Sequence, residues 1–141
     1  MPHQRAAALG ARTKFMAVNS GSSQIATALG PLAHGMVFAQ VMPNPWSGKT
    51  ALAREYQAAF GRAHPGRERS YGSLEGYATA KALVAALELA GTQPTRAGFV
   101  KAQEAADIDL GGVRLSYRPG DHRGSAFVDL SMVNRTGRFL Q

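Results

Sequence analysis

Residues 14–42 read KFMAVNSGSSQIATALGPLAHGMVFAQVM, and this stretch decides the fold. It contains an apolar run at residues 14–18, a hydroxyl-rich turn, a segment with helical spacing up to Gly30, and a second apolar run at residues 36–42. Ser22 or Ser23 is suited to cap the helix, because a serine hydroxyl accepts a hydrogen bond from a first-turn N–H. The second run lacks alternation, as is typical of a strand buried on both faces. This order of strand, helix and strand predicts a parallel sheet.

The rest of the chain adds three helices and then antiparallel strands. The expected elements are a helix capped by Ser47, a long helix beginning near Ser73, a short helix capped by Thr95, and strands at residues 113–117 and 125–133. The long helix has an apolar side formed by Leu74, Tyr77, Ala80, Val84 and Leu87. The chain is therefore expected to be an α/β protein in which helices cover both faces of a parallel sheet.

Composition excludes several classes of protein. The chain has 141 residues, no cysteine, 45% hydrophobic residues and 18% charged residues, so a disulfide scaffold and thiolate metal sites are excluded. No apolar run approaches the ~20 residues that span a bilayer. Residues 1–9 contain no apolar core of signal-peptide length, so we expect no export signal in the chain as given.

The net charge of +7 suggests an anionic partner at first sight, but its distribution argues against a specific nucleic-acid reader. The excess of positive charge lies in residues 1–72, which contain eight Lys and Arg residues and only two acidic residues. Its densest part, Arg62, Arg67 and Arg69, lies in a loop rich in Pro and Gly, without a stacking aromatic residue before Tyr71. The four histidines lack metal-ligand spacing, so we expect no metal and no cofactor.

The loop from Asn19 to Ser23 is the strongest candidate site in the residues themselves. It joins the carboxyl end of a strand to the start of a helix, where open α/β sheets bind ligands through free backbone donors and hydroxyls. An ordinary capped turn explains the same Gly and Ser residues equally well. No Gly-x-Ser-x-Gly elbow surrounds Ser20, and nothing positive points to catalysis. The alternative hypothesis is an α/β enzyme that holds a phosphate or carboxylate here.

Three blocks of sequence carry a resemblance to a known family. They are residues 14–20 with 29–37, residues 70–77 with 82–91, and residues 110–117 with 120–122 and the final strand through Phe139. In order and spacing they resemble the C-terminal portion of bacterial substrate-binding proteins of the leucine/isoleucine/valine type, which serve ABC transporters. No single motif is specific, but together the blocks cover nearly the whole chain.

The resemblance implies an incomplete type I periplasmic-binding-protein fold with two α/β lobes around a cleft. Residues 1–45 would belong to the C-terminal lobe, residues 46–115 to the N-terminal lobe, and residues 116–141 would return to the C-terminal lobe. The front part of the family fold is missing from this sequence, so we expect the chain to be a piece of a longer protein.

The resemblance also implies that the protein binds a ligand and does not catalyse a reaction. A solute-binding component of an ABC uptake transporter would bind an amino acid or similar small organic solute between the lobes and then meet the transporter's membrane permease subunits. The intact family member is expected in the periplasm. The expected ligand-binding residues are Asn19, Ser20, Ser22, Tyr71, Ser73 and Glu75. Family members that bind amino acids commonly place an acid near Asn19, opposite the ligand's ammonium. Because Asn19 and Ser20 are neutral, an aromatic or other carboxylic acid fits as well as a branched-chain amino acid.

Overall fold

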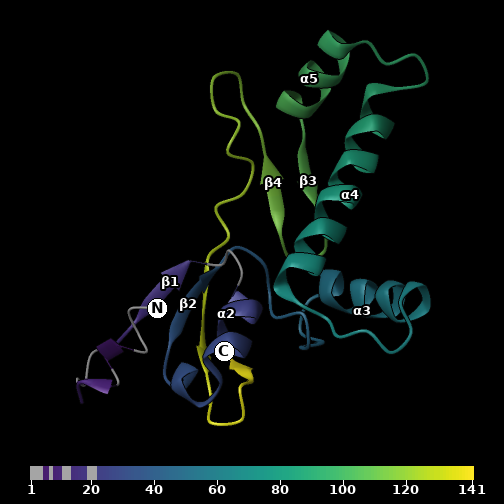
Figure 1. Cartoon of the computed structure of the whole chain (residues 1–141). Coiled ribbons are helices and arrows are strands. Elements are labelled where there is room, and N and C mark those ends of the chain that lie inside the picture. The colour runs from purple at the N-terminus through teal and green to yellow at the C-terminus, as the bar shows by residue number, and fades with distance from the viewer. Residues whose placement is uncertain (1–4, 7, 11–13, 19–21) are drawn as a thin grey trace. The chain divides into compact units, whose positions relative to one another are not determined.

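The computed structural model describes residues 5–6, 8–10, 14–18 and 22–141, and the chain divides into two compact units (Figure 1). Unit 1 comprises Met1–Val41 and Val128–Gln141, and unit 2 comprises Met42–Phe127. Each unit combines helices with strands, so the expected α/β class is confirmed.

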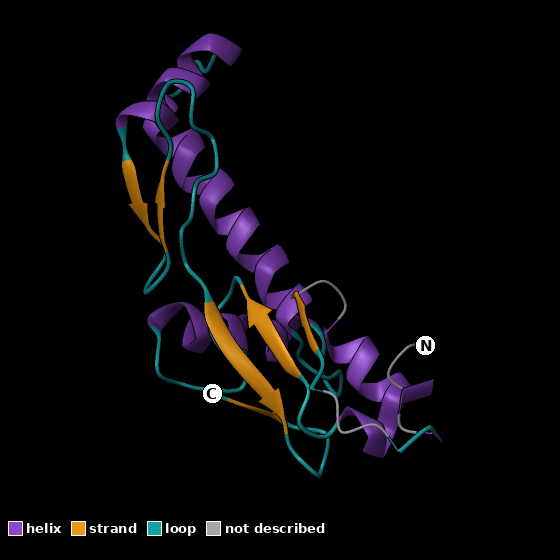
Figure 2. Cartoon of the chain, turned by 90° about the vertical axis from the view of Figure 1, so that its left-hand side faces the viewer, coloured by secondary structure: helices purple, strands orange, loops and turns teal. Residues whose placement is uncertain are grey.

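Unit 1 is built around a four-stranded mixed sheet in the order β1-β2-β5-β6. Its elements are β1 (Met16–Val18), α2 (Ser22–Leu29), the 3-10 helix η1 (Gly30–Ala33), β2 (Val37–Gln40), β5 (Asp129–Val133) and β6 (Phe139–Leu140). β1 and β2 are parallel, and the crossover between them contains α2. β5 runs antiparallel to β2, and β6 runs antiparallel to β5 (Figure 2).

One face of this sheet forms the core of unit 1. Phe38, Ser131, Val133 and Phe139 are buried on it, and the rings of Phe38 and Phe139 meet edge to face with centroids 5.7 Å apart. The buried residues of α2 and η1 are Ser22, Ala26, Leu29 and Ala33. The apolar members of this set, Ala26, Leu29 and Ala33, therefore form the buried side of α2 and η1.

Unit 2 packs three helices with a two-stranded hairpin. Its elements are α3 (Ala51–Ala63), α4 (Tyr71–Ala90), α5 (Arg96–Ala105), β3 (Asp107–Asp109) and β4 (Arg114–Ser116). Its core cluster comprises Leu52, Tyr56, Leu74, Ala78, Ala86, Ile108, Leu110, Val113 and Leu115. Alternation in residues 113–117 correctly predicted β4. β3 was not expected, because it has only Ile108 as an apolar residue between two aspartates.

Two helix starts differ from the sequence prediction. α3 is capped by Thr50, whose Oγ1 accepts a hydrogen bond from the Ala53 N–H at 3.2 Å, and not by Ser47. α4 begins at Tyr71, because Ser70 supplies the cap. The expected cap of α5 is confirmed: Thr95 accepts from the Gly98 N–H at 3.1 Å. Each hydroxyl satisfies a backbone donor that has no partner inside the helix.

The burial of two apolar patterns also differs from the prediction. β2 was expected to be buried on both faces, but it alternates between buried Phe38 and Gln40 and half-buried Val37 and Ala39. On α4 the buried side contains Leu74 and Ala78, whereas Ala80, Val84 and Leu87 of the expected buried side are exposed. In both elements the sequence contains more apolar surface than the described residues cover.

Candidate functional site

The first turns of α4 carry three of the six predicted site residues, and a tight cap holds the start of the helix. The Ser70 hydroxyl accepts from the Ser73 N–H at 3.1 Å, and the Ser73 hydroxyl accepts from the Ser70 N–H at 3.0 Å. This reciprocal pair is a capping box, which satisfies two backbone donors at once. The same end of the helix carries the positive partial charge of its peptide dipoles, which favours anionic groups.

Ser73 is also joined to the core of unit 2. Its hydroxyl lies 2.7 Å from the hydroxyl of Tyr56, a residue with 1% of its surface exposed. The ring of Tyr56 contacts the rings of Phe60 and Tyr77, at centroid distances of 5.4 and 5.9 Å. Packing against these two rings therefore fixes the direction of the Tyr56 hydroxyl, and this hydroxyl in turn orients Ser73.

Tyr71 lies beside an aromatic residue that the sequence did not single out. The ring of Tyr71 is 3% exposed and meets the ring of Trp46 edge to face, with centroids 5.6 Å apart. Trp46 is 43% exposed, and its backbone N–H donates to Asn44 Oδ1 at 2.9 Å, which fixes the turn after Pro45. The available signal was that the chain's single tryptophan follows Pro43 and Pro45.

Glu75 lies one turn further along α4 and is partly buried. Its carbonyl oxygen accepts a hydrogen bond from the Thr79 hydroxyl at 2.9 Å. Its carboxylate lies in the second turn of α4, beyond the first turn, which contains no acidic residue. The structure places Tyr71, Ser73 and Glu75 on the first two turns of α4, with Trp46 against Tyr71. Ser73 lies two residues from each of the other two and therefore does not share a helix face with them.

The other three predicted site residues belong to unit 1. Ser22 begins α2 and is 2% exposed. Its neighbour Ser23 has a buried hydroxyl with no hydrogen-bond partner in the described part of the chain. Asn19 and Ser20 lie outside the described residues. Of the predicted loop site, the structure therefore shows only the start of its helix.

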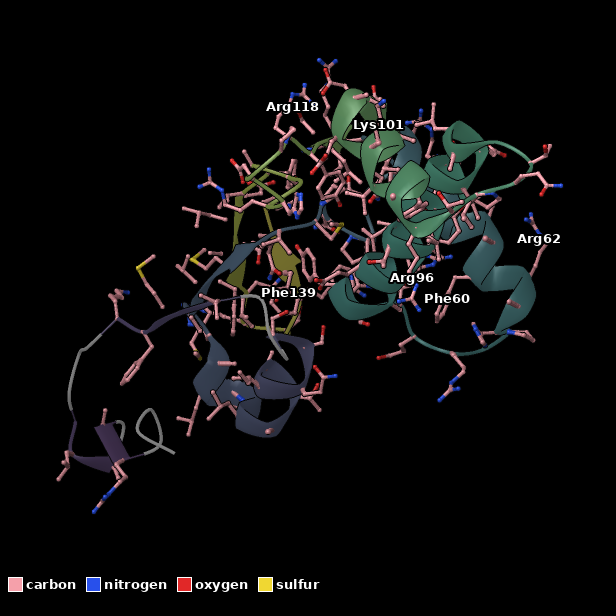
Figure 3. All side chains as sticks on the ribbon, turned by 90° about the horizontal axis from the view of Figure 1, so that it is seen from above. Phe60, Arg62, Arg96, Lys101, Arg118 and Phe139 are labelled. Atoms are coloured by element: carbon pink, nitrogen blue, oxygen red, sulfur yellow. The ribbon has the colours of Figure 1, made fainter. Side chains whose placement is uncertain are left out.

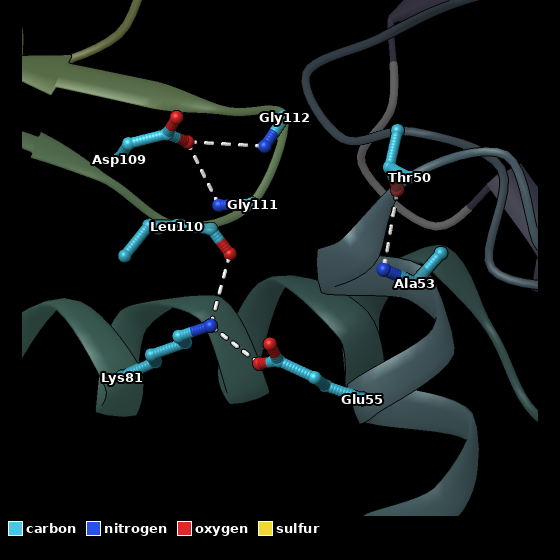
Figure 4. A network of polar contacts seen from close by, with 8 residues as sticks. All are labelled: Thr50, Ala53, Glu55, Lys81, Asp109, Leu110, Gly111 and Gly112. Carbon is cyan, nitrogen blue, oxygen red and sulfur yellow. Dashed lines mark hydrogen bonds and ion pairs between the residues drawn. The ribbon is translucent and has the colours of Figure 1, made fainter.

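A separate polar network fixes the hairpin of unit 2 to its helices (Figure 4). Asp109 Oδ1 accepts from the N–H groups of Gly111 and Gly112, at 2.8 and 3.1 Å. These hydrogen bonds, that of Gly112 first, lower the pKa of Asp109 below its usual value. Lys81 pairs with Glu55 and donates to the Leu110 carbonyl at 3.0 Å. This network connects β3, α3 and α4, so we assign it a structural role.

Comparison with known proteins identifies the family. A family model described as periplasmic binding protein matches residues 4–138, which is nearly the whole chain. The chain belongs to the periplasmic binding protein family. The resemblance stated from the sequence is thereby confirmed. A search of curated proteins gives no match.

Solved structures of periplasmic binding proteins share the fold of the chain. A possible leucine/isoleucine/valine-binding protein from Rhodopirellula baltica SH 1 is 29% identical, with a TM-score of 0.87 over 99% of this chain and 38% of its own. A substrate-binding periplasmic protein from Ralstonia solanacearum is 26% identical, with a TM-score of 0.85 over 98% of this chain and 40% of its own. A branched-chain amino-acid ABC transporter structure from Thermus thermophilus with bound valine is 19% identical, with a TM-score of 0.74 over 99% of this chain and 40% of its own, and shows the fold alone. The chain spans about two fifths of the length of these proteins.

The charged surface of this periplasmic binding protein contains several local ion pairs in unit 2. Arg118 pairs with Asp107 at 2.8 Å, and Arg123 pairs with Asp121 at 2.7 Å, which lowers the pKa of Asp121 to about 2. Arg62 and Arg118 lie far apart at the periphery of unit 2 in Figure 3. Basic residues that are spread out and partly neutralised do not form the continuous stripe that a nucleic-acid backbone requires.

The described residues contain neither a metal cluster nor a membrane helix. In residues 5–6, 8–10, 14–18 and 22–141, no three His, Cys, Asp or Glu side chains gather as metal ligands. None of the helices in these ranges is both long enough and apolar enough to cross a bilayer. The family and the structural relatives are substrate-binding proteins rather than enzymes.

Proposed function

We propose that the chain is part of an ABC-transporter solute-binding protein and supplies residues of its solute site. The observation that carries this proposal is the family match over residues 4–138. The Rhodopirellula baltica relative, described as a possible leucine/isoleucine/valine-binding protein, supports a small organic solute. The intact protein would bind this solute in the periplasm and present it to the transporter's permease subunits, without chemical conversion.

We propose that each unit belongs to a different lobe of the family fold. Unit 1 would be part of the C-terminal lobe and unit 2 part of the N-terminal lobe. The expected boundaries near residues 45 and 115 remain predictions. The units themselves separate after Val41 and after Phe127. Movement between lobes would then couple solute binding to recognition by the permease, as in other hinge-type closures.

The proposed solute is an amino acid or an aromatic or carboxylic acid. Asn19, Ser20 and Ser22 would offer a neutral, hydroxyl-rich loop at the start of α2, suited to a carboxylate or another acceptor. In unit 2, Tyr71, Ser73 and Glu75 would contribute the polar contacts. Trp46 would add an exposed aromatic surface, because its ring is held against Tyr71 and yet remains 43% accessible.

The experiment is a thermal-shift screen of a chimera in which this chain replaces the matched segment of the Rhodopirellula baltica protein. The screen covers branched-chain and aromatic amino acids, aromatic acids and fatty acids. A solute present at about 100 times its Kd stabilises the folded state by about 2.7 kcal/mol, which raises Tm by a few degrees. We expect stabilisation by one chemical class, without turnover. Turnover of the stabilising solute would contradict the proposal and favour the enzyme hypothesis.

Two matched pairs of variants test the site residues in the same chimera. Glu75→Gln and Tyr71→Phe are expected to weaken the stabilising solute about tenfold, because a hydrogen bond to a charged group contributes about 1.5–3 kcal/mol. Glu88→Gln and Tyr77→Phe change the same residue types elsewhere on α4 and are expected to leave the affinity within about twofold. If Glu75→Gln and Glu88→Gln weaken solute binding equally, Glu75 does not belong to the proposed site. The same holds for Tyr71 if Tyr71→Phe and Tyr77→Phe weaken binding equally.

A further inference from the structure

The charge of unit 1 is almost entirely of one sign. Its two segments, Met1–Val41 and Val128–Gln141, contain five Lys and Arg residues and a single acidic residue, Asp129. All ion pairs found among the described residues join side chains of unit 2. The cations of unit 1 that the structure describes therefore remain available to an anionic partner, and their positions decide which partner fits.

Three of these cations lie at one end of the sheet, which we call the basic end and define by Lys14, Arg135 and Arg138. Lys14 comes two residues before β1, and the two arginines belong to the turn that joins β5 to β6. All three residues are exposed. Because β1 is parallel to β2 and β5 is antiparallel to it, the start of β1 and the end of β5 lie at the same end of the sheet. Neighbouring strands are about 4.8 Å apart, so β1 and β5, the two neighbours of β2, are separated by only about 10 Å.

Strand register places the acidic residue of unit 1 at the opposite end of the sheet. Close to the basic end, the Gly35 N–H just before β2 donates to the carbonyl oxygen of Val133, the last residue of β5, at 2.8 Å. At the other end of the same two strands, Asp129 is opposite Gln40. Four residues of extended strand separate Asp129 from Val133 by about 13 Å, which exceeds the Debye length of about 8 Å at physiological ionic strength. The carboxylate of Asp129 therefore does little to neutralise the basic end.

The turn that carries the two arginines is held by its own hydrogen bonds (the yellow turn at the foot of Figure 1). Asn134 Oδ1 accepts from the Thr136 N–H, the Thr136 hydroxyl and the Arg138 N–H, each at 2.9 Å. The Asn134 N–H donates to the Arg138 carbonyl oxygen, also at 2.9 Å. The backbone of this turn is therefore ordered before any partner binds, which lowers the entropy cost of association.

The residues near the basic end favour a lipid surface over other anionic partners. Exposed leucines lie in the adjoining segments: Leu32 of η1 is 38% exposed and Leu140 of β6 is 49% exposed. By contrast, Phe139 is buried and Phe15 is half-buried. A single-stranded nucleic acid binds through exposed aromatic rings on which its bases stack, and the centre of a protein interface is commonly anchored by aromatic residues. Cations beside exposed leucines instead match the headgroup phosphates and the acyl boundary of a bilayer.

We propose that the basic end of unit 1 is a docking surface for a bilayer that contains anionic phospholipids. Lys14, Arg135 and Arg138 contact the headgroup phosphates, and Leu32 and Leu140 reach the acyl boundary. This peripheral contact keeps the intact protein close to the membrane that contains its permease subunits. The inference rests on the periplasmic location proposed above, and it does not depend on which solute is bound.

The test measures binding of the 141-residue chain to vesicles by co-sedimentation. The probes are vesicles of phosphatidylcholine alone and vesicles of equal parts phosphatidylcholine and phosphatidylglycerol. We expect binding to the anionic vesicles only, and loss of this binding at about 1 M salt, where the Debye length is about 3 Å. Equal binding to both kinds of vesicle, or no binding to the anionic vesicles, overturns the proposal. Circular dichroism verifies folding, and the chimera described above replaces the chain if the chain alone does not fold.

Variants that remove charge locate the docking surface. Each Lys or Arg close to an anionic bilayer strengthens binding about fivefold. The double variant Arg135→Gln/Arg138→Gln is therefore expected to weaken binding to anionic vesicles about 25-fold, and Lys14→Gln about fivefold. Arg62→Gln/Arg67→Gln is the matched control, because it removes the same charge from exposed residues of unit 2. We expect this control to bind within about twofold of the wild type.

Each alternative outcome has a definite meaning. Equal weakening in the two double variants shows that net charge alone drives binding, and it overturns the assignment of the basic end. Tighter binding to a duplex DNA oligonucleotide than to anionic vesicles overturns the choice of lipid. A chimera that binds its solute but not anionic vesicles overturns this proposal alone. A chimera that binds anionic vesicles through the basic end but binds no solute leaves the docking proposal intact and contradicts the proposed function alone.

Discussion

At the scale of single residues, Gly111 shows how one backbone position connects the hairpin of unit 2 to α3. Its φ is +99°, which L side chains rarely adopt, and its carbonyl oxygen accepts from the Leu52 N–H at 2.9 Å. A Cβ at this position would lie 2.9 Å from the Leu52 nitrogen and 3.0 Å from the Ala51 Cβ. Only glycine allows the turn and α3 to approach this closely.

Gly111→Ala is therefore expected to lower the free energy of unfolding by about 3 kcal/mol or more, through combined backbone strain and steric clash. Gly66→Ala is the matched control, because Gly66 also has a positive φ (+77°) but no heavy atom within 4 Å of an added Cβ. It should cost about 1 kcal/mol. Urea denaturation measures the free energy of unfolding of both variants. An equal decrease in the two variants would contradict the role given to the close approach of Gly111 to α3.

Gln40 is the fully buried polar side chain at the end of β2. Its Nε2 donates to Ser131 Oγ at 2.9 Å, and its Oε1 has no hydrogen-bond partner in the described structure. Ser131→Ala should cost about 1–3 kcal/mol, because the Gln40 amide then loses its partner inside the core. Combining it with Gln40→Met removes both polar groups and should restore stability to near that of the wild type. Denaturation of the single and double variants tests this, and additive losses would contradict it.

At the scale of elements, the β3–β4 hairpin responds to pH through Asp109. Because the folded-state pKa of Asp109 lies below the usual 3.8, its carboxylate stabilises the folded state above the unfolded-state pKa. This stabilisation is lost as pH falls through the lower, folded-state pKa. Asp121 behaves in the same way between pH 3.8 and about 2, through its hydrogen bonds with Arg123.

Asp109→Asn should therefore flatten the pH dependence of unfolding below pH ~4, because an amide has no charge to lose. Asp121→Asn should flatten the pH dependence of unfolding between pH 3.8 and about 2. Guanidinium denaturation between pH 2 and 7 measures both effects. A wild-type stability that does not change over the acidic range would contradict the role given to these carboxylates.

Local chemistry explains which elements the sequence predicted. The hydroxyl of Thr95, followed by a helical pattern, correctly predicted the start of α5. The start of α4 was misplaced, because Ser70 and Ser73 are equally good caps in sequence and only their reciprocal hydrogen bonds show which precedes the helix. β3 depends on pairing with β4 and has little local signal of its own.

At the scale of the whole molecule, the apolar patterns predicted more burial than the described residues provide. Both β2 and α4 have apolar residues on the faces that remain exposed, including Val84 and Leu87. Sequence patterns report the environment for which a surface is suited, and these surfaces are suited to a second layer. Sequence patterns also predicted only part of the candidate site. Tyr71, Ser73 and Glu75 are close in sequence on the first two turns of α4, but the proximity of Trp46 to Tyr71 depends on tertiary packing.

The central proposal is that the chain contributes to a solute site and that the intact protein performs no chemistry. Isothermal titration of the chimera with the solute found by thermal shift, followed by mass spectrometry of the recovered solute, tests it most directly. The account predicts one solute bound per chimera, about tenfold weaker binding in Tyr71→Phe, and complete recovery of unchanged solute. Saturable binding that is equal in Tyr71→Phe and Tyr77→Phe, or conversion of the solute to a product, would contradict it.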